Sequence, residues 1–293
     1  MSDWLMLLEV CLAGVGNGGL YGLAGLAFVL IYKATRVVNL AIGELLMIGA
    51  YFLLTFASIL GLPLWLGIAL AIAGSGFLGT LIERVLIRPM LGESPISVFM
   101  ITVGLSSILV GAVELIWSGT PMRLPDFMPS EPIMIGEAML APKIFYSLLV
   151  AAAMIAFVLV LFHFWRGGVA LRATASNQIA AYSMGINVPR VFSAAWAVGA
   201  MVAAVAGILV GSISTLSPEM GVFGLSVLVV VIVGGLDSIL GALVGGVLVG
   251  LVEALTGTYL GGEYKMLATF TLLVIILMIR PYGLFGTREI ERL

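Results

Sequence analysis

Long runs of apolar residues make up most of the chain, and short polar stretches separate them. A helix needs about 20 apolar residues to cross the hydrocarbon core of a bilayer, so each run of this length predicts one membrane span. Seven such runs lie at residues 5–31, 38–58, 62–83, 96–118, 144–165, 191–213 and 264–280. They are continuous and much longer than the alternating segments of about 10 residues that build a membrane β-barrel, so helices are predicted.

Another apolar stretch, residues 223–256, is too long for one span and is interrupted by a glycine-rich turn signal at 234–238. The part before the turn has about a dozen residues, which is fewer than a crossing helix needs. The part after it, 239–256, is long enough. We therefore predict one transmembrane domain over residues 1–293, an all-α polytopic helix bundle with about eight full spans and one short or re-entrant helix.

The composition fits a membrane protein. Hydrophobic residues make up 62% of the chain and charged residues 10%, and the mean hydropathy is +1.23. A soluble domain has about 25% charged residues. The net charge of −2 gives no basis for nucleic-acid binding. Because the first ten residues lack the basic region of a signal peptide, the first run is expected to remain as a span.

Basic residues in the short loops predict the orientation in the membrane. They form four groups, which are Lys33 with Arg36, Arg84 with Arg88, Arg166 with Arg172 and Arg190, and Arg280 with Arg288 and Arg292. All four groups fall on one face, the cytoplasmic one, if the short helix crosses the membrane. The C-terminus is then cytoplasmic and the N-terminus outside. A short helix that only dips in and out would place the last arginines outside, so crossing is preferred.

The loop at 119–143 then lies on the opposite side of the membrane from the basic groups. It carries Asp126, Glu131 and Glu137 against Arg123 and Lys143. The positive-inside rule therefore holds for this loop as well.

Many glycines in the predicted spans lie four residues apart. They are Gly14, Gly18 and Gly22, Gly207 and Gly211, Gly241 and Gly245, and Gly246 and Gly250. Small residues at this spacing let helix backbones approach closely in lipid. We favour packing within the chain, and a subunit interface or a moving surface is the alternative.

Several kinds of chemistry have no basis in the sequence. No lysine follows the glycine pattern of a phosphate-binding loop, so the chain carries no ATPase site of its own. No Cys/His cluster predicts a metal site, and no nucleophile lies beside a base, so an enzyme is not expected. The one histidine, His163, stands among aromatic residues at the end of a span, a position typical of an interfacial belt.

Acidic residues within spans are functional candidates because burying a charge in the membrane is costly. Glu9, Glu83, Glu114 and Glu253 are expected near span ends, with Glu83 marking a boundary beside Arg84. Glu44 is different, because it is expected one to two turns inside the second span. It is either a carboxylate bonded to a neighbouring helix or part of the substrate path or gate.

Residues 166–190 are polar between two apolar runs and predict a short helix outside the membrane. Asn177 can cap its start, Gly185 suits its end, and Pro189 prevents continuation. We expect Ile179, Ala180 and Ser183 on one face and Ala181, Tyr182 and Met184 on another. Such a helix fits a groove in another protein, and the alternative is a plain connector.

The scarcity of deep polar residues argues against an ion-coupled carrier that works alone, although the broken stretch at 223–256 keeps that alternative open. A transporter without ion-coupling residues needs a separate subunit that supplies energy, and the helix at 177–185 would be the segment that such a subunit binds. An intramembrane enzyme is the third alternative, and no pair of reactive residues supports it.

The sequence Ala180-Ala181, with Gly185 after it, resembles the ATPase-docking loop of ABC importer permeases, whose motif starts E-A-A-x-x-x-G. Ile179 stands at the Glu position, and the downstream I-x-L-P is not matched. Three stretches, 19–51, 171–187 and 231–253, resemble the branched-chain amino acid permeases in particular. The chain is most similar to the shorter of the two permease subunits of that family.

The resemblance implies a heteromeric importer in a bacterial inner membrane. A second, homologous permease subunit, two cytoplasmic ATPase subunits that bind ATP and Mg²⁺, and an extracytoplasmic substrate-binding protein are the implied partners. Family substrates are branched-chain amino acids, urea, short amides and aromatic acids. Members often have Gln or His where Ile42 stands, so an apolar or aromatic solute is favoured here.

These arguments give two sets of candidate residues. For ATPase coupling they are Arg172, Asn177, Ala180, Ala181, Tyr182, Met184 and Gly185. For the translocation path or gate they are Asn39, Ile42, Gly43, Glu44, Gly234 and Gly235. We further expect Arg172 to pair with an acidic group of the ATPase or with carbonyls of its own loop.

Overall fold

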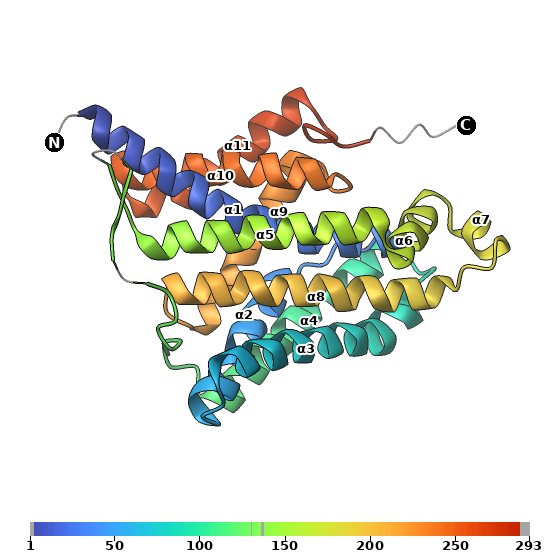
Figure 1. Ribbon diagram of the computed structural model, residues 1–293. Coiled ribbons are helices and arrows are strands. Elements are labelled where there is room, and N and C mark those ends of the chain that lie inside the picture. The colour runs from blue at the N-terminus through green and yellow to red at the C-terminus, as the bar shows by residue number, and fades with distance from the viewer. Residues whose placement is uncertain (1–2, 130, 136–137, 288–293) are drawn as a thin grey trace. The chain divides into compact units, whose positions relative to one another are not determined.

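A computed structural model of the chain describes residues 3–129, 131–135 and 138–287. Most of its regular structure is helical (Figure 1). Within these ranges eight helices are long and apolar enough to cross a membrane, and a shorter apolar helix covers Pro218–Gly234. The predicted all-α polytopic bundle is therefore confirmed. Glu137, Arg288 and Arg292 lie outside the described residues.

The elements follow one another as the apolar runs predict. Seven of the eight membrane-length helices correspond to α1 (Asp3–Thr35), α3 (Leu64–Ile82), α4 (Pro95–Trp117), α5 (Pro142–Phe164), α8 (Val188–Ile213), α10 (Ile239–Tyr259) and α11 (Lys265–Ile279). The eighth contains α2 (Ile42–Leu53) and extends to Ile59. The shorter helices are α6 (Arg166–Ser176), α7 (Gln178–Ser183) and α9 (Phe223–Gly234). Wider π-helical turns continue α2 over Leu54–Ile59 (η1) and α3 over Glu83–Ile87 (η2). Strands β1 (Ile133–Ile135) and β2 (Ala138–Leu140) pair antiparallel.

Side-chain caps fix where several of these helices begin. The Ser94 hydroxyl accepts a hydrogen bond from Ser97 N at 3.2 Å at the start of α4. The Asn187 side chain accepts from Arg190 N at 3.2 Å before α8, and the Ser238 hydroxyl accepts from Gly241 N at 3.0 Å before α10. Each cap satisfies a backbone N–H that the helix itself leaves without a partner.

The chain forms two compact units. Unit 1 consists of Met1–Val29, Met128–Ala152 and Ser226–Leu293, and unit 2 of Leu30–Phe127 and Ala153–Leu225. Unit 1 contains most of α1 and α9 together with α10 and α11. Unit 2 contains α2, α3, α4 and α8 with the short helices α6 and α7.

Glycines hold α1 against α10 in unit 1. A Cβ atom on Gly18 would lie 2.7 Å from the Cα of Val247, and one on Gly246 would lie 2.6 Å from the backbone of both Gly18 and Gly22. Only hydrogen side chains allow this backbone contact. The prediction that these glycines pack within the chain is confirmed for this pair of helices.

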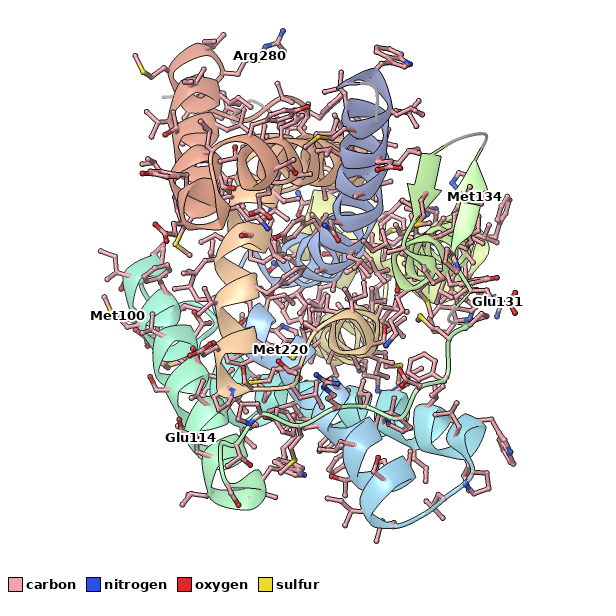
Figure 2. The ribbon with its side chains drawn as sticks, turned by 90° about the vertical axis from the view of Figure 1, so that its left-hand side faces the viewer. Met100, Glu114, Glu131, Met134, Met220 and Arg280 are labelled. Atoms are coloured by element: carbon pink, nitrogen blue, oxygen red, sulfur yellow. The ribbon has the colours of Figure 1, made fainter. Side chains whose placement is uncertain are left out.

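In unit 2 α8 packs against both α2 and α3 (Figure 1). Its Trp196 is fully buried, and a Cβ on Gly207 would meet the Leu46 carbonyl of α2. Near the end of α4, Trp117 donates a hydrogen bond from Nε1 to the Thr55 hydroxyl at 2.9 Å. Figure 2 shows Glu114 near this end of α4 and Met100 toward its other end, so Glu114 lies near a span end as predicted.

Candidate functional site

Residues 166–190, within unit 2, form two short helices between the long helices α5 and α8. The Asn177 side chain accepts a hydrogen bond from Ala180 N at 2.9 Å and caps α7. The chain turns at Gly185, whose φ is +83°, a value that glycine adopts without strain. The predicted helix between Asn177 and Gly185 is confirmed, and it covers Gln178–Ser183. Helix α6 was not predicted.

The predicted faces of α7 are wrong. Ala181 is 4% exposed and packs into a small core with Leu171 and Phe192. Tyr182 and Met184, which were expected on the same face as Ala181, are 71% and 83% exposed. The core contact of Ala181 sets the rotation of this single helical turn. As a result, the apolar side chains exposed on the surface of α7 and its last turn are Ile179, Tyr182 and Met184, and Ala180 is exposed as well.

Arg172 joins α6 to the end of α5. Its guanidinium donates one hydrogen bond to the Phe162 carbonyl and another to the His163 carbonyl at 3.2 Å. The group also lies 5.4 Å from the centroid of the Phe162 ring. The last carbonyls of a helix have no partner within it and carry partial negative charge, which suits a cation. The structure thus gives Arg172 carbonyl partners at the end of α5 instead of the expected carbonyls of its own loop.

A second anchor holds the start of α8, at the exit of the same loop. The fully buried Glu83 carboxylate accepts two hydrogen bonds from Arg88, at 3.0 and 2.8 Å, and one from the Ser193 hydroxyl at 2.7 Å. Arg88 also donates to the Pro189 carbonyl at 3.1 Å. The expectation that Glu83 only marks a boundary beside Arg84 is wrong, because its partner is Arg88. Arg172 and Arg88 thus fix both ends of the loop that carries α7.

Another group of candidates lies at the start of α2, also in unit 2. This helix begins only at Ile42, four residues later than the span predicted at 38–58, so Glu44 lies in its first turn. Glu44 is 7% exposed and its Oε1 accepts from the Ser106 hydroxyl at 2.7 Å. Its Oε2 is buried without a hydrogen-bond partner.

The segment before α2 is irregular backbone enclosed by protein. The Thr102 hydroxyl of α4 donates to the Val38 carbonyl and accepts from Leu40 N, each at 3.3 Å. Asn39 is fully buried, and its Oδ1 accepts from Ala41 N at 3.0 Å while its Nδ2 has no partner. Non-helical backbone at membrane depth occurs where it is buried in protein or lines a water-filled cavity.

Backbone contact between glycines closes this region. A Cβ on Gly43 would meet the Gly221 carbonyl, and it would lie 2.8 Å from the Cα of Gly224 at the start of α9. A Cβ on Gly221 would lie 2.8 Å from Glu44 Oε1. The buried side chain of Ile42 completes the first turn of α2. Side chains larger than hydrogen therefore have no room at these glycines.

The remaining candidates, Gly234 and Gly235, belong to unit 1, whereas residues 39–44 belong to unit 2. They end α9, and Gly235 has a φ of +112°. The C-terminal segment caps this helix end, because Phe285 N donates to the Gly234 carbonyl at 2.9 Å and Leu284 N to the Val233 carbonyl at 2.8 Å. The turn expected from the glycine-rich signal is present.

A polar cluster in unit 1 was missed. The Glu253 carboxylate of α10 accepts hydrogen bonds from Tyr21 of α1 at 2.6 Å, Ser226 of α9 at 3.1 Å and Thr269 of α11 at 3.0 Å. Four helices therefore meet at one carboxylate. Among the described residues, no group of three or more His, Cys, Asp or Glu side chains is placed to hold a metal ion.

Comparison with known proteins agrees with this architecture. The profile of the family described as the permease component of the branched-chain amino acid transport system matches residues 10–278. This chain belongs to that family. The resemblance to the branched-chain amino acid permeases of ABC importers is thereby confirmed.

Three similar proteins are each matched over 90% or more of their length. The high-affinity branched-chain amino acid transport system permease protein LivH of Salmonella typhimurium is 30% identical, over 99% of both chains. The corresponding protein BraD of Pseudomonas aeruginosa is 31% identical, over 100% of both chains. A probable permease of this kind from Methanocaldococcus jannaschii is 27% identical, over 92% of this chain and 90% of the relative.

One solved structure shares the fold of this family member. PsaBC from Streptococcus pneumoniae, in complex with Fab, matches with a TM-score of 0.51 and 13% sequence identity. The match covers 94% of this chain and 92% of that one. At this identity it supports the helical architecture alone.

Proposed function

We propose that the chain is a permease subunit of an ABC importer that moves branched-chain amino acids, or related small amino-acid, amide or aromatic-acid solutes, into the cell. ATP hydrolysis in partner subunits drives the movement. The observation that carries the proposal is the full-length family match together with a short helix, α7, that presents apolar side chains between two membrane spans.

Helix α7 is the coupling helix in this proposal. Ile179, Tyr182 and Met184 are exposed on a helix too short to bury them against its own chain. Large apolar side chains grouped in this way are typical of a docking surface. Arg172 fixes α6 to the end of α5, and Arg88 fixes the start of α8. A movement of α7 would therefore be transmitted to α5, α6 and α8 as rigid elements. Asn177, Ala180, Ala181 and Gly185 keep the turn in shape.

The proposed assembly follows from the same family. It contains a second, homologous permease subunit, two ATPase subunits that bind ATP and Mg²⁺ below α7, and a substrate-binding protein on the other side of the membrane. The basic loops place α7 and the C-terminus in the cytoplasm and the N-terminus outside, in a bacterial inner membrane. The chain itself is a pore-forming subunit and binds no cofactor.

We place the translocation path beside the first turn of α2. Glu44 and Asn39 each keep a buried polar atom without a protein partner. Burying such atoms is costly, so their presence supports a function at this position. The contact of Gly43 with Gly221 and Gly224 brings the first residues of α9, which belong to unit 2, close to that turn. Gly234 and Gly235 end the same helix and are the proposed hinge of the gate.

The coupling role is tested by Met184→Glu in the assembled transporter. A charge on the exposed face of α7 should reduce co-purification of the ATPase subunits by at least about tenfold, which is the effect of losing about 1.4 kcal/mol of binding energy. ATP-driven uptake should fall with it. Met134→Glu is the matched control, because Met134 is a 62% exposed methionine on β1 (Figure 2). Unchanged co-purification and uptake of Met184→Glu would reject the docking role.

An ion-coupled carrier that acts alone is the second candidate. The irregular backbone before α2 and the buried Glu44 are features of such carriers. The purified chain, reconstituted alone in vesicles with a sodium or proton gradient, distinguishes the two. Accumulation of labelled leucine without ATP would favour the carrier, and accumulation only with ATPase partners and ATP would favour the importer.

A further inference from the structure

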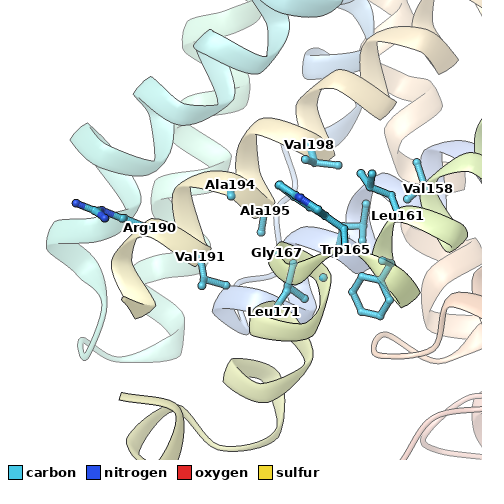
Figure 3. A pocket seen from close by; sticks show the side chains of 13 residues that line it. Val158, Leu161, Trp165, Gly167, Leu171, Arg190, Val191, Ala194, Ala195 and Val198 are labelled. Atoms are coloured by element: carbon cyan, nitrogen blue, oxygen red, sulfur yellow. The ribbon is translucent and has the colours of Figure 1, made fainter. Parts of the chain in front are cut away.

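A crevice with a volume of about 220 Å³ opens between the end of α5, α6 and the first half of α8, within unit 2. Figure 3 shows aliphatic side chains around it, with the indole of Trp165 near Ala195 and Val198. Val158, Leu161, Leu171 and Val191 line it as well. Among the lining residues that the structure describes, Arg190 alone is charged, and its guanidinium points away from the apolar side chains (Figure 3).

The depth and chemistry of the crevice indicate what fills it. Val158 precedes Phe164, the last residue of α5, by about 9 Å at 1.5 Å per residue, so the crevice runs along the membrane spans. A soluble protein does not reach that depth, whereas lipid chains are already present there. Pockets for small-molecule ligands are usually larger, about 300–1,000 Å³, and carry a small number of placed polar groups. The walls here suit hydrocarbon.

The surroundings of the crevice are basic. From residue 138 to residue 217 the chain has no Asp or Glu, while Arg166, Arg172 and Arg190 lie where α5, α6 and α8 meet the loop. Arg172 is bound to the α5 carbonyls, and Arg166 and Arg190 are exposed. Basic residues near the membrane surface attract anionic lipid headgroups. Trp165, between them, is a residue type that prefers the interface.

We propose that this crevice binds an anionic phospholipid. One acyl chain lies between α5 and α8 against Trp165, and the phosphate lies at Arg166 and Arg190. The lipid fills the space between α6 and α8, the two helices that hold α7. Its occupancy therefore stabilises the base of the loop, and this inference does not depend on which solute the protein transports.

The binding site is tested by fluorescence of the full chain in mixed micelles. Phosphatidylglycerol with brominated acyl chains is compared with brominated phosphatidylcholine, and the quenching that Trp165→Phe removes is assigned to Trp165. We expect quenching of Trp165 at a severalfold lower fraction of phosphatidylglycerol than of phosphatidylcholine, with the difference shrinking as salt is added. Equal quenching by the two lipids would overturn the proposal.

Two sets of variants test the acyl-chain site and the headgroup site separately. Ala194→Phe, at the exposed edge of the crevice, should abolish the Trp165 quenching, and Val198→Phe is a second filling variant should the first not fold. Ala156→Phe, an exposed alanine of α5 that does not line the crevice, should leave it unchanged. Persistent quenching in both filling variants would overturn insertion of the acyl chain.

Removal of the two charges tests the headgroup contact. Arg166→Gln with Arg190→Gln should remove the preference for phosphatidylglycerol, and Arg84→Gln, an exposed arginine elsewhere in unit 2, should keep it. A preference that survives the double substitution would overturn the phosphate site. A protein occupant is checked with Ala194→Cys in the assembled transporter, where crosslinking to a partner subunit would overturn the lipid assignment.

Discussion

Arg88→Met is expected to destabilise the protein strongly, because it leaves the Glu83 carboxylate buried without its cation. Glu83 is 0% exposed, and Arg88 supplies two of its hydrogen bonds at 3.0 and 2.8 Å. After the substitution only the Ser193 hydroxyl, at 2.7 Å, still donates to that carboxylate. Removal of one partner of a buried ion pair costs about 3–5 kcal/mol. The Arg88 side chain is 38% exposed and partly screened by solvent, so we expect the lower end, about 3 kcal/mol.

The double variant Glu83→Met with Arg88→Met separates an unpaired charge from lost packing. It removes both charges, and Ser193 keeps a hydrogen bond to the Pro189 carbonyl at 3.3 Å. Replacing both members of a buried pair with apolar residues is often close to neutral, so we expect a cost of about 1 kcal/mol. The double variant should therefore be more stable than Arg88→Met, although it carries one more substitution.

The assay is unfolding of the purified chain in mixed micelles, by titration with SDS, checked by thermal midpoints in one detergent. Arg84→Met is the matched control, because Arg84 is an exposed neighbour of the pair, and its stability should equal that of the wild type. The reasoning is refuted if Arg88→Met is as stable as the wild type. It is also refuted if the double variant is less stable than Arg88→Met, since lost packing would then outweigh the unpaired charge.

Three further substitutions test other parts of the structure. Glu44→Gln should keep the Ser106 hydrogen bond and the fold but lower ATP-driven uptake by about tenfold or more, equivalent to about 1.4 kcal/mol. Glu114→Gln, on the exposed surface of α4, should leave uptake unchanged. A fully active Glu44→Gln would show that the carboxylate has only a structural role. Gly18→Leu should lower the free energy of unfolding by about 3 kcal/mol, because its Cβ would lie 2.7 Å from a backbone atom of α10. Gly104→Leu should leave stability unchanged, because a Cβ at Gly104 has no atom within 4 Å. Equal stability of the two variants would contradict the contact between α1 and α10. Trp117→Phe should lose about 1 kcal/mol with its hydrogen bond to Thr55, and the exposed Trp65→Phe should lose none in the same titration.

The number of spans followed from the sequence because length and apolarity alone decide whether a helix can cross a bilayer. The start of α2 did not. Residues 38–41 belong to an apolar run, yet they are not helical, and Thr102 of α4 holds their backbone. Such a contact between segments distant in the chain leaves no periodic signal. Glu44 was therefore expected deeper inside its helix than the first turn, where the structure places it.

Helix α6 has no counterpart among the predicted elements, since only one short helix was expected within residues 166–190. Gly167 and Gly168 begin this helix, and a Cβ on Gly168 would meet the Phe162 backbone at the end of α5. Glycine here permits close packing of a helix that turns back on the one before it. The cost of glycine inside a helix is only about 1 kcal/mol, which a tertiary contact offsets.

The cluster around Glu253 was beyond sequence reasoning for another reason. Its hydroxyl donors, Tyr21, Ser226 and Thr269, come from three helices far apart in the chain. Each looks like an ordinary polar residue of an apolar span. The sequence shows the carboxylate near the end of a predicted span, but not the three hydroxyl groups that surround it.

The Glu83–Arg88 pair shows how local geometry can hide an interaction whose members are only five residues apart. On an α-helix, residues three or four positions apart face each other, so a charge five positions away is not read as a partner. Glu83–Ile87 is a π-helical turn, in which backbone hydrogen bonds run from i to i+5. The wider turn brings position 88 beside position 83. A 3₁₀ turn over Arg88–Met90 follows and ends the helix, so Arg88 lies in its last turn and also reaches the Pro189 carbonyl and Ser193 of α8. The pair therefore depends on an irregular turn, and its loss is expected to loosen the exit of the loop that carries α7.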